Sequence, residues 1–135
     1  MNRILVGTDT SASADMAVRA AAELARLREA ELLILHVRSP NGGHDAADPK
    51  KSADPDRYLA SMTSRFPALR VRSWSEAGDP ADRLVEVAAA ERVDTIVLGN
   101  RGVHGPRWRV RESVPNLVLR HAPCSVLIVD TRAAQ

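Results

Sequence analysis

Short aliphatic runs recur along the chain, and the polar content of each run separates buried strands from exposed ones. Residues 4–6, 32–37 and 96–99 contain almost no polar side chains, which is typical of parallel strands covered on both faces. Residues 68–75 alternate apolar and polar positions, as expected for an edge or half-exposed strand. The run SVLIVD, residues 125–130, predicts a fifth strand.

Amphipathic stretches between these runs predict four helices. The stretch SASADMAVRAAAELARLREA is rich in strong helix formers and places several alanines and Val18 on one face. Asp54-Pro55 and Asp79-Pro80 each combine an N-cap residue with a proline in the first helical turn. The expected N-caps, in chain order, are Ser11 or Ser13, Asp54, Asp79 and Ser113, and the second and fourth helices are expected to end near Phe66 and His121.

Strands and helices therefore alternate, and we expect an α/β fold: a three-layer α/β/α doubly wound sheet of five parallel strands with four helices. Residues 1–135 are expected to form a single domain, with polar residues 39–56 as a surface loop inside the repeating pattern. Ligands of such sheets bind beyond the carboxyl ends of the strands, where the strand order reverses. Those ends are Gly7-Thr8-Asp9 and the stretch from Gly99 onward.

Composition and charge exclude several classes of partner. Aromatic residues make up 3% of the chain and the formal net charge is +2, so neither base stacking nor a strong positive field favours nucleic acid. The single cysteine, Cys124, allows no internal disulfide and no thiolate metal cluster. No apolar run reaches membrane-spanning length, and a cytoplasmic protein without a membrane partner is expected.

Three glycines mark the most suggestive stretch. Gly99, Gly102 and Gly105 recur between a predicted strand and a predicted helix. Glycine lets the backbone approach a ligand closely, and the start of a helix offers free N–H groups to a phosphate. The same residues also fit a flexible connection, and the sequence alone does not choose between the two. The dinucleotide pattern GxGxxG and the Walker loop are both absent from the sequence.

Four segments resemble the universal stress protein family: the opening ILVGTD, the run LLILHV, the segment DTIVLGNRG and the ending SVPNLVLRHAPCSVLIV. Nucleotide-binding members of that family carry Gly, two residues, Gly, nine residues, then Gly-Ser or Gly-Thr. This sequence matches at Gly99, Gly102 and Ser113 with the nine-residue gap, and has Glu112 in place of the third glycine. The resemblance covers nearly the whole chain.

The resemblance implies a fold of the adenine nucleotide α-hydrolase type and a site for ATP with Mg²⁺, AMP or cyclic AMP. By motif position, Asp9 would contact adenine or ribose and Val37 the adenine. The implied nucleotide-binding residues are Gly7, Thr8, Asp9, Val37, Leu98, Gly99, Arg101, Gly102, Ser113 and Val114. The resemblance further implies a regulatory role in the stress response, a homodimer formed through the C-terminal strand, and regulatory protein partners.

Two acidic residues qualify this expectation. Asp9 can accept a hydrogen bond from a ribose hydroxyl or an adenine amino group, or it can interact with the N–H groups of the helix that follows. Glu112 repels phosphate: two unit charges 4 Å apart cost about 4 kcal/mol at an effective dielectric of about 20, which lowers affinity roughly a thousandfold. Cyclic AMP or AMP suffers less than ATP. Nearby basic residues either offset Glu112 or form a solvated loop: Arg101, His104, Arg107, Arg109 and Arg111.

The remaining polar residues form no catalytic constellation, because no nucleophile stands beside a base. His36 lies within a buried run and is expected to be a hydrogen-bonded core residue. His121 suits the dipole at a helix end, and Cys124 is expected to be buried and unreactive. We therefore expect a binding protein and no enzyme.

Two alternatives belong to different functional classes. One is a homodimeric protein-interaction module of the same fold that binds no nucleotide. The other is an ATP-hydrolysing or adenylyl-transferring enzyme, which would need a serine- and glycine-rich phosphate loop after the first strand. Thr8-Asp9-Thr10-Ser11 does not supply that loop.

Overall fold

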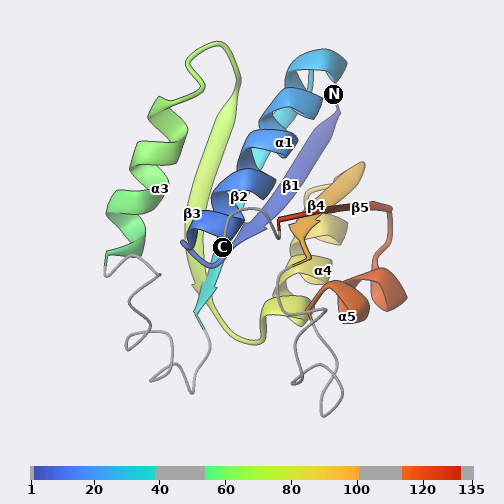
Figure 1. The fold of residues 1–135 in the computed structure, drawn as a ribbon. Helices are drawn as coiled ribbons and strands as arrows, with labels where there is room; N and C mark the ends of the chain where they lie inside the picture. Colours follow the sequence, from blue (N-terminus) through green and yellow to red (C-terminus); the bar gives the residue numbers. More distant parts are fainter. Residues whose placement is uncertain (1, 39–53, 101–113, 132–135) are drawn as a thin grey trace.

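Five parallel strands form one sheet in the order β3-β2-β1-β4-β5 (Figure 1). The computed structural model describes residues 2–38, 54–100 and 114–131. Within those ranges the elements are β1 Arg3–Thr8, α1 Ala12–Arg28, β2 Glu31–Arg38, α3 Pro55–Ser64, β3 Val71–Ala77, α4 Pro80–Ala90, β4 Thr95–Gly99, α5 Val114–His121 and β5 Ser125–Val129. The α/β fold expected from the hydrophobic pattern is confirmed.

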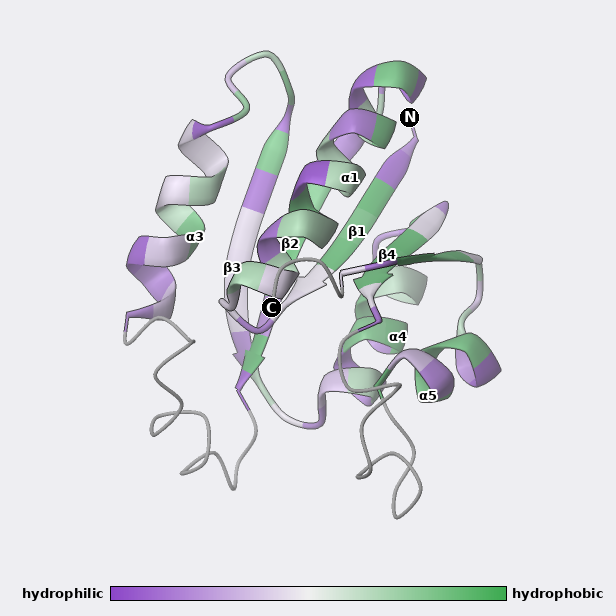
Figure 2. Ribbon diagram, in the orientation of Figure 1, coloured by the Kyte–Doolittle hydropathy of each residue, from purple (hydrophilic) through white to green (hydrophobic). Residues whose placement is uncertain are grey.

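The sheet separates two apolar cores, because successive residues of a buried strand point to opposite faces. Ile4 and Val6 of β1 pack with α1 and α3, whereas Leu5 between them packs with α4 and α5. Leu32 and Leu33 of β2 repeat the same division. All five side chains are fully buried, and each contributes about 1.5–3 kcal/mol of burial free energy. Figure 2 shows the resulting apolar colour along the central strands, with polar residues on the outer faces of the helices.

The helices begin at the capping residues that the sequence indicates. Ser11, and not Ser13, is the N-cap of α1, and its Oγ accepts the N–H of Ala14 at 3.2 Å. Asp54 and Asp79 cap α3 and α4 in the same way, each followed by a proline. Among the described helices, including the 17-residue α1, none has the length together with the apolar content that crossing a lipid bilayer requires.

The bounds of β3, observed at Val71–Ala77 and predicted at residues 68–75, differ most from the prediction. β3 begins at Val71, three residues after the start of the alternating pattern at Ala68. The intervening residues form a turn, in which the N–H of Leu69 donates to the C=O of Phe66 at 3.1 Å. Phe66 and Leu69 pack against the core on the α1 side, so their apolar character reflects burial in a turn and not a strand.

The strand order reverses at β1, and this reversal opens a crevice. β1 pairs with β2 up to Thr8 and His36, at the very end of the strand. On its other side the pairing between β1 and β4 stops at Val6 and Val97. The last residues of β1 and β4 are therefore not joined to each other, and ligand sites of such sheets form at this position.

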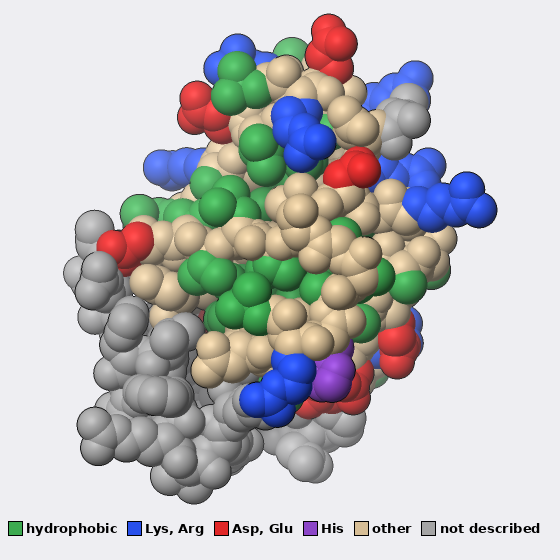
Figure 3. All heavy atoms as spheres, turned by 90° about the vertical axis from the view of Figure 1, so that its right-hand side faces the viewer, with side chains coloured by type: hydrophobic (Ala, Val, Ile, Leu, Met, Phe, Trp, Pro, Cys, Tyr) green, Lys and Arg blue, Asp and Glu red, His purple; other side chains and the backbone are tan. Residues whose placement is uncertain are grey.

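The other end of the sheet is the edge strand β5. In Figure 3, which views the molecule from the side of β5 and α5, apolar side chains gather across the middle of the face. Leu127 of β5 is 42% exposed and Leu119 of α5 is 53% exposed. An apolar edge of this kind is where further strands add to a sheet.

Candidate functional site

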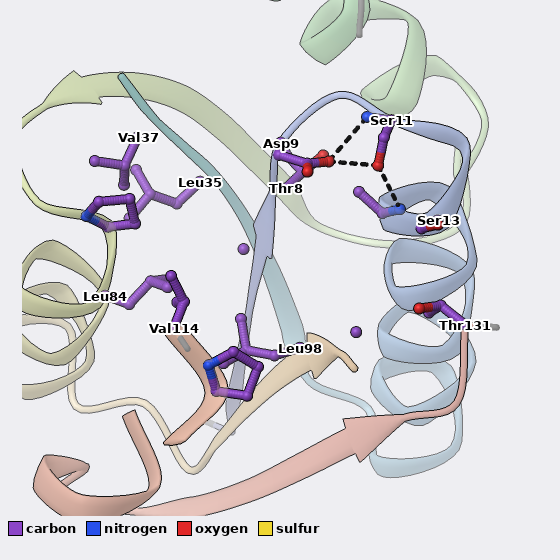
Figure 4. A pocket seen from close by; sticks show the side chains of 15 residues that line it. Thr8, Asp9, Ser11, Ser13, Leu35, Val37, Leu84, Leu98, Val114 and Thr131 are labelled. Carbon is purple, nitrogen blue, oxygen red and sulfur yellow. Dashed lines mark hydrogen bonds between the residues drawn. The ribbon is translucent and has the colours of Figure 1, made fainter. Parts of the chain in front are cut away.

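A cavity of about 280 Å³ occupies the crevice between the carboxyl ends of β1 and β4 (Figure 4). Its size is close to the lower limit for small-molecule sites. Segments far apart in the sequence contribute the lining: the β1–α1 turn, the end of β2, the starts of α4 and α5, the end of β4 and the segment that follows β5. The lining residues are Gly7, Thr8, Asp9, Ser11, Ser13, Ala14, Leu35, Val37, Pro80, Leu84, Leu98, Gly99, Val114, Pro115 and Thr131.

One wall of the cavity is aliphatic. Figure 4 shows Val37 and Leu35 of β2 on one side, facing Leu84, Leu98 and Val114. Such a wall can pack against the flat face of a ring without competing for its polar edge.

Gly7 brings two segments of this wall together. A Cβ atom at Gly7 would lie 3.0 Å from Leu98 Cδ2 and 3.2 Å from both δ-carbons of Leu84. These distances are tighter than ordinary van der Waals contact, so the absence of a side chain lets the wall close. Close packing therefore requires a glycine at this position whether or not a ligand is bound.

The opposite rim is polar and tightly organised. Asp9 Oδ1 accepts the N–H of Ser11 at 3.0 Å and also the hydroxyl of Ser11 (Figure 4). Thr10 adopts the left-handed conformation with φ 68°, and its N–H donates to Thr8 Oγ1 at 3.0 Å. Asp9 thus contacts an N–H group at the start of α1, which is one of the two roles expected from the sequence. It also lines the cavity, as the other expected role, contact with a nucleotide, requires.

Gly99 is held by packing against a residue that the sequence reading did not include. A Cβ atom at Gly99 would lie 2.9 Å from Thr131 Cγ2. Thr131 is fully buried, and its N–H and hydroxyl both donate to Asn100 Oδ1, at 3.0 and 3.2 Å. Asn100 thereby connects the end of β4 to the second residue after β5, and Thr131 forms part of the cavity wall.

A second polar cluster fixes β3 to α4 beside the aliphatic wall. Trp74 Nε1–H donates to Glu76 Oε2 at 2.6 Å, and Arg83 Nε donates to Glu76 Oε1 at 2.9 Å. The Trp74 hydrogen bond, with help from Arg83, holds the pKa of the Glu76 carboxyl below its usual range, although partial burial opposes the shift. Glu76 pairs with Val37 in the strand register, so the cluster supports the β2 side of the cavity.

Seven of the ten expected site residues line the cavity: Gly7, Thr8, Asp9, Val37, Leu98, Gly99 and Val114. The other three, Arg101, Gly102 and Ser113, lie outside the described residues, as do Glu112 and the basic residues of the same stretch. The sequence reading missed further lining residues, of which Ser11 and Pro80 could have been found from their capping motifs. No motif in the sequence around Thr131 indicates that it lines the cavity.

The other chemically active residues behave largely as expected. His36 is 7% exposed, and its Nδ1 lies 2.7 Å from Ser75 Oγ, which confirms a hydrogen-bonded core histidine. The prediction that Cys124 is buried is wrong: it is half-buried, because β5 is an edge strand. That partial burial still raises the pKa of its thiol. Within the described ranges, no three His, Cys, Asp or Glu side chains are grouped as metal ligands.

Comparison with known proteins decides the family. Residues 1–130 match the model of the universal stress protein family. The chain belongs to this family. A universal stress protein of Mycobacterium tuberculosis (strain H37Rv) is 32% identical over 142 residues, which cover 95% of each chain.

Solved structures of the family share the fold. The crystal structure of a universal stress protein in complex with cAMP superposes with a TM-score of 0.80 at 29% identity, covering 96% of this chain and 97% of the other. A universal stress protein family protein of Arabidopsis thaliana with AMP bound has a TM-score of 0.74 at 19% identity, covering 100% of this chain and 95% of the other. Adenine nucleotides are therefore ligands of members of this universal stress protein family.

Proposed function

We propose that this universal stress protein is a cytoplasmic regulatory protein that binds an adenine nucleotide in the β1/β4 cavity and performs no catalysis. The observation that carries the proposal is that all seven described residues among the ten that the family resemblance implies line one cavity. The cAMP complex of a family member with the same fold supports the choice of ligand class.

The lining suggests how the ligand lies. The aliphatic wall around Val37 and Leu84 suits the adenine ring, and Asp9 on the opposite rim suits a ribose hydroxyl. The phosphate would then lie toward Gly99 and Val114, where β4 ends and α5 begins.

Charge favours a ligand with few phosphates. Glu112 stands at the motif position where glycine is usual in the family, and a carboxylate there opposes each additional negative charge. We expect cyclic AMP or AMP to bind more tightly than ATP, and Mg²⁺ to matter for ATP alone. Glu112→Gly should raise nucleotide affinity at least tenfold, most for ATP.

Calorimetric titration of the full chain with cyclic AMP, AMP and ATP, with and without Mg²⁺, tests the proposal. Micromolar binding of one nucleotide is expected. Asp9→Asn keeps one oxygen for the Ser11 contacts and removes the charge, so affinity should fall about tenfold. Asp54→Asn makes the same change at the α3 cap, away from the cavity, and should leave affinity unchanged. If none of the three nucleotides bound at millimolar concentration, the proposal would be overturned.

The exposed edge of β5 favours a homodimer as a second proposal. Two copies pairing through β5 would extend the sheet and cover the apolar face around Leu127. Light scattering should report twice the chain mass. Leu127→Lys should shift the equilibrium to monomer, whereas Leu27→Lys, at a 67% exposed leucine at the end of α1, should not. An unchanged mass for Leu127→Lys would exclude this edge. We further propose that regulatory protein partners bind the homodimer formed through β5.

A further inference from the structure

A chain of hydrogen bonds links α3 to the β1–α1 turn of the cavity. The N–H of Thr10 donates to Thr8 Oγ1 at 3.0 Å, and the Thr8 hydroxyl donates to Tyr58 Oη at 3.2 Å. The Tyr58 hydroxyl donates in turn to Asp15 Oδ1 in the first turn of α1. Tyr58 belongs to α3 and does not line the cavity, whereas Thr8 does.

The chain runs in one direction. The backbone N–H of Thr10 can only donate, and an ionised Asp15 carboxylate can only accept. The hydroxyls of Thr8 and Tyr58 each accept from one side and donate to the other, so loss of either breaks the sequence of bonds. Burial, together with the bond to Asp15, raises the pKa of Tyr58, so its hydroxyl keeps the proton that it donates at every physiological pH.

The turn that this chain holds is strained and buried. Thr10 carries a side chain at φ 68°, a conformation that few residues other than glycine adopt without support. Thr8 and Thr10 are 7% and 6% exposed, so water does not readily replace a lost protein partner. The same turn places Asp9 where its Oδ1 accepts both donors of Ser11. The position of Asp9 on the cavity rim therefore depends on the conformation of Thr10.

The ring of Tyr58 is fixed independently of its hydroxyl. It packs against the apolar cluster between the sheet, α1 and α3, which includes Leu59 and Met62 of the same helix. A phenylalanine at this position keeps that packing and deletes only the hydroxyl. The contribution of the hydrogen-bond chain can thus be separated from the contribution of the ring.

We propose that Tyr58 is a positioning residue of the nucleotide site, which acts through Thr8 to hold the Thr10 turn and so sets the place of Asp9. The proposal rests on the proposed nucleotide binding for its effect on affinity, but its effect on the turn does not need a ligand. It makes α3 part of the machinery of the site, although no residue of α3 touches the cavity.

Tyr58→Phe tests this in two separate measurements on the full chain. Without ligand, amide hydrogen exchange followed by NMR should be at least tenfold faster at Thr10, relative to Leu5 in the core of β1. With ligand, calorimetry should show a three- to tenfold loss of cyclic AMP affinity. Exchange at Thr10 relative to Leu5 that matches the wild type would overturn the proposal, whether or not any nucleotide binds.

Thr63→Val is the matched control. It also removes a single half-buried hydroxyl from α3, one that donates to Leu59 O at 3.0 Å and lies 2.9 Å from Ser73 Oγ, outside the chain to Thr8. This variant should lose stability without faster relative exchange at Thr10 and without loss of affinity. If Tyr58→Phe and Thr63→Val changed the relative exchange rate at Thr10 and the nucleotide affinity to the same extent, the positioning role of Tyr58 would be overturned. Faster exchange at Thr10 without nucleotide binding by the wild type would overturn the nucleotide proposal alone.

Discussion

Adding one methyl group at Gly99 should destabilise the protein through a single identifiable contact. In Gly99→Ala the new Cβ would stand 2.9 Å from Thr131 Cγ2, about 0.5 Å short of ordinary contact. Thr131 has little room to withdraw, because it is fully buried and both its N–H and its hydroxyl are bound to Asn100 Oδ1. The clash therefore acts where the end of β4 packs against Thr131, the second residue after β5.

The magnitude follows from two opposing terms. Overpacking of a buried site costs about 1–3 kcal/mol. Glycine-to-alanine replacement at a compatible backbone conformation returns about 0.4–1 kcal/mol by restricting the unfolded chain, and Gly99 does not have a positive φ. The free energy of unfolding should therefore fall by about 1–2 kcal/mol.

Thr131→Ser supplies the second arm of a double-mutant cycle. It removes the clashing methyl and keeps the hydroxyl that binds Asn100, at a cost of about 1 kcal/mol for the lost buried methyl. In the double variant the closest remaining atom is Thr131 Oγ1, 3.3 Å from the new Cβ, so Gly99→Ala should cost about 0.5 kcal/mol or less there. Urea unfolding followed by circular dichroism measures all four proteins. Coupling within about 0.5 kcal/mol of zero would refute this explanation of Gly99.

Two further predictions concern titratable groups. Because the folded state lowers the pKa of Glu76, this group adds stability that is present above its ordinary pKa of 4.5 and is lost as pH falls through the lower folded value. The free energy of unfolding should fall on acidification below about pH 4.5, less steeply in Glu76→Gln, and Trp74 emission in a Trp108→Phe background should report the same titration. An identical acid slope in Glu76→Gln would contradict the assignment. Burial raises the pKa of Cys124, so its thiol should react more slowly with a disulfide reagent at pH 8 than free cysteine does, and at the free rate in urea.

Features encoded by neighbouring residues were predictable from the sequence. The starts of α3 and α4 are correct because Asp54-Pro55 and Asp79-Pro80 combine a cap with a fixed φ, and both signals act within one helical turn. The buried strands were predicted correctly because a short, uninterrupted aliphatic run is typical of a parallel strand covered on both faces. The start of β3 was misplaced because Phe66 and Leu69 are apolar for a different reason, the burial of a turn.

The sequence predicted the site residues that belong to family motifs, but not the residues that pack against them. Gly7 and Gly99 were correctly placed on the crevice, but each has a packing partner that only the fold reveals, Leu98 for the first and Thr131 for the second. Thr131 becomes a neighbour of Gly99 through β4–β5 pairing, and nothing in its own surroundings along the chain indicates that. The bond from Thr8 to Tyr58 joins residues 50 positions apart and has the same origin.

The central position of β1 has a consequence for biosynthesis. This strand leaves the ribosome before the other four, yet its partner on one side, β4, follows roughly 90 residues later, which is several seconds at ordinary elongation rates of about 5–20 residues per second. Until then β1 can pair only with β2, which in turn pairs with β3, so the edge of β1 that later pairs with β4 stays open beside the apolar residues Ile4, Leu5 and Val6. A ribosome stalled within α4 would hold such an intermediate, so this stretch of translation is the interval in which the nascent protein most needs a chaperone.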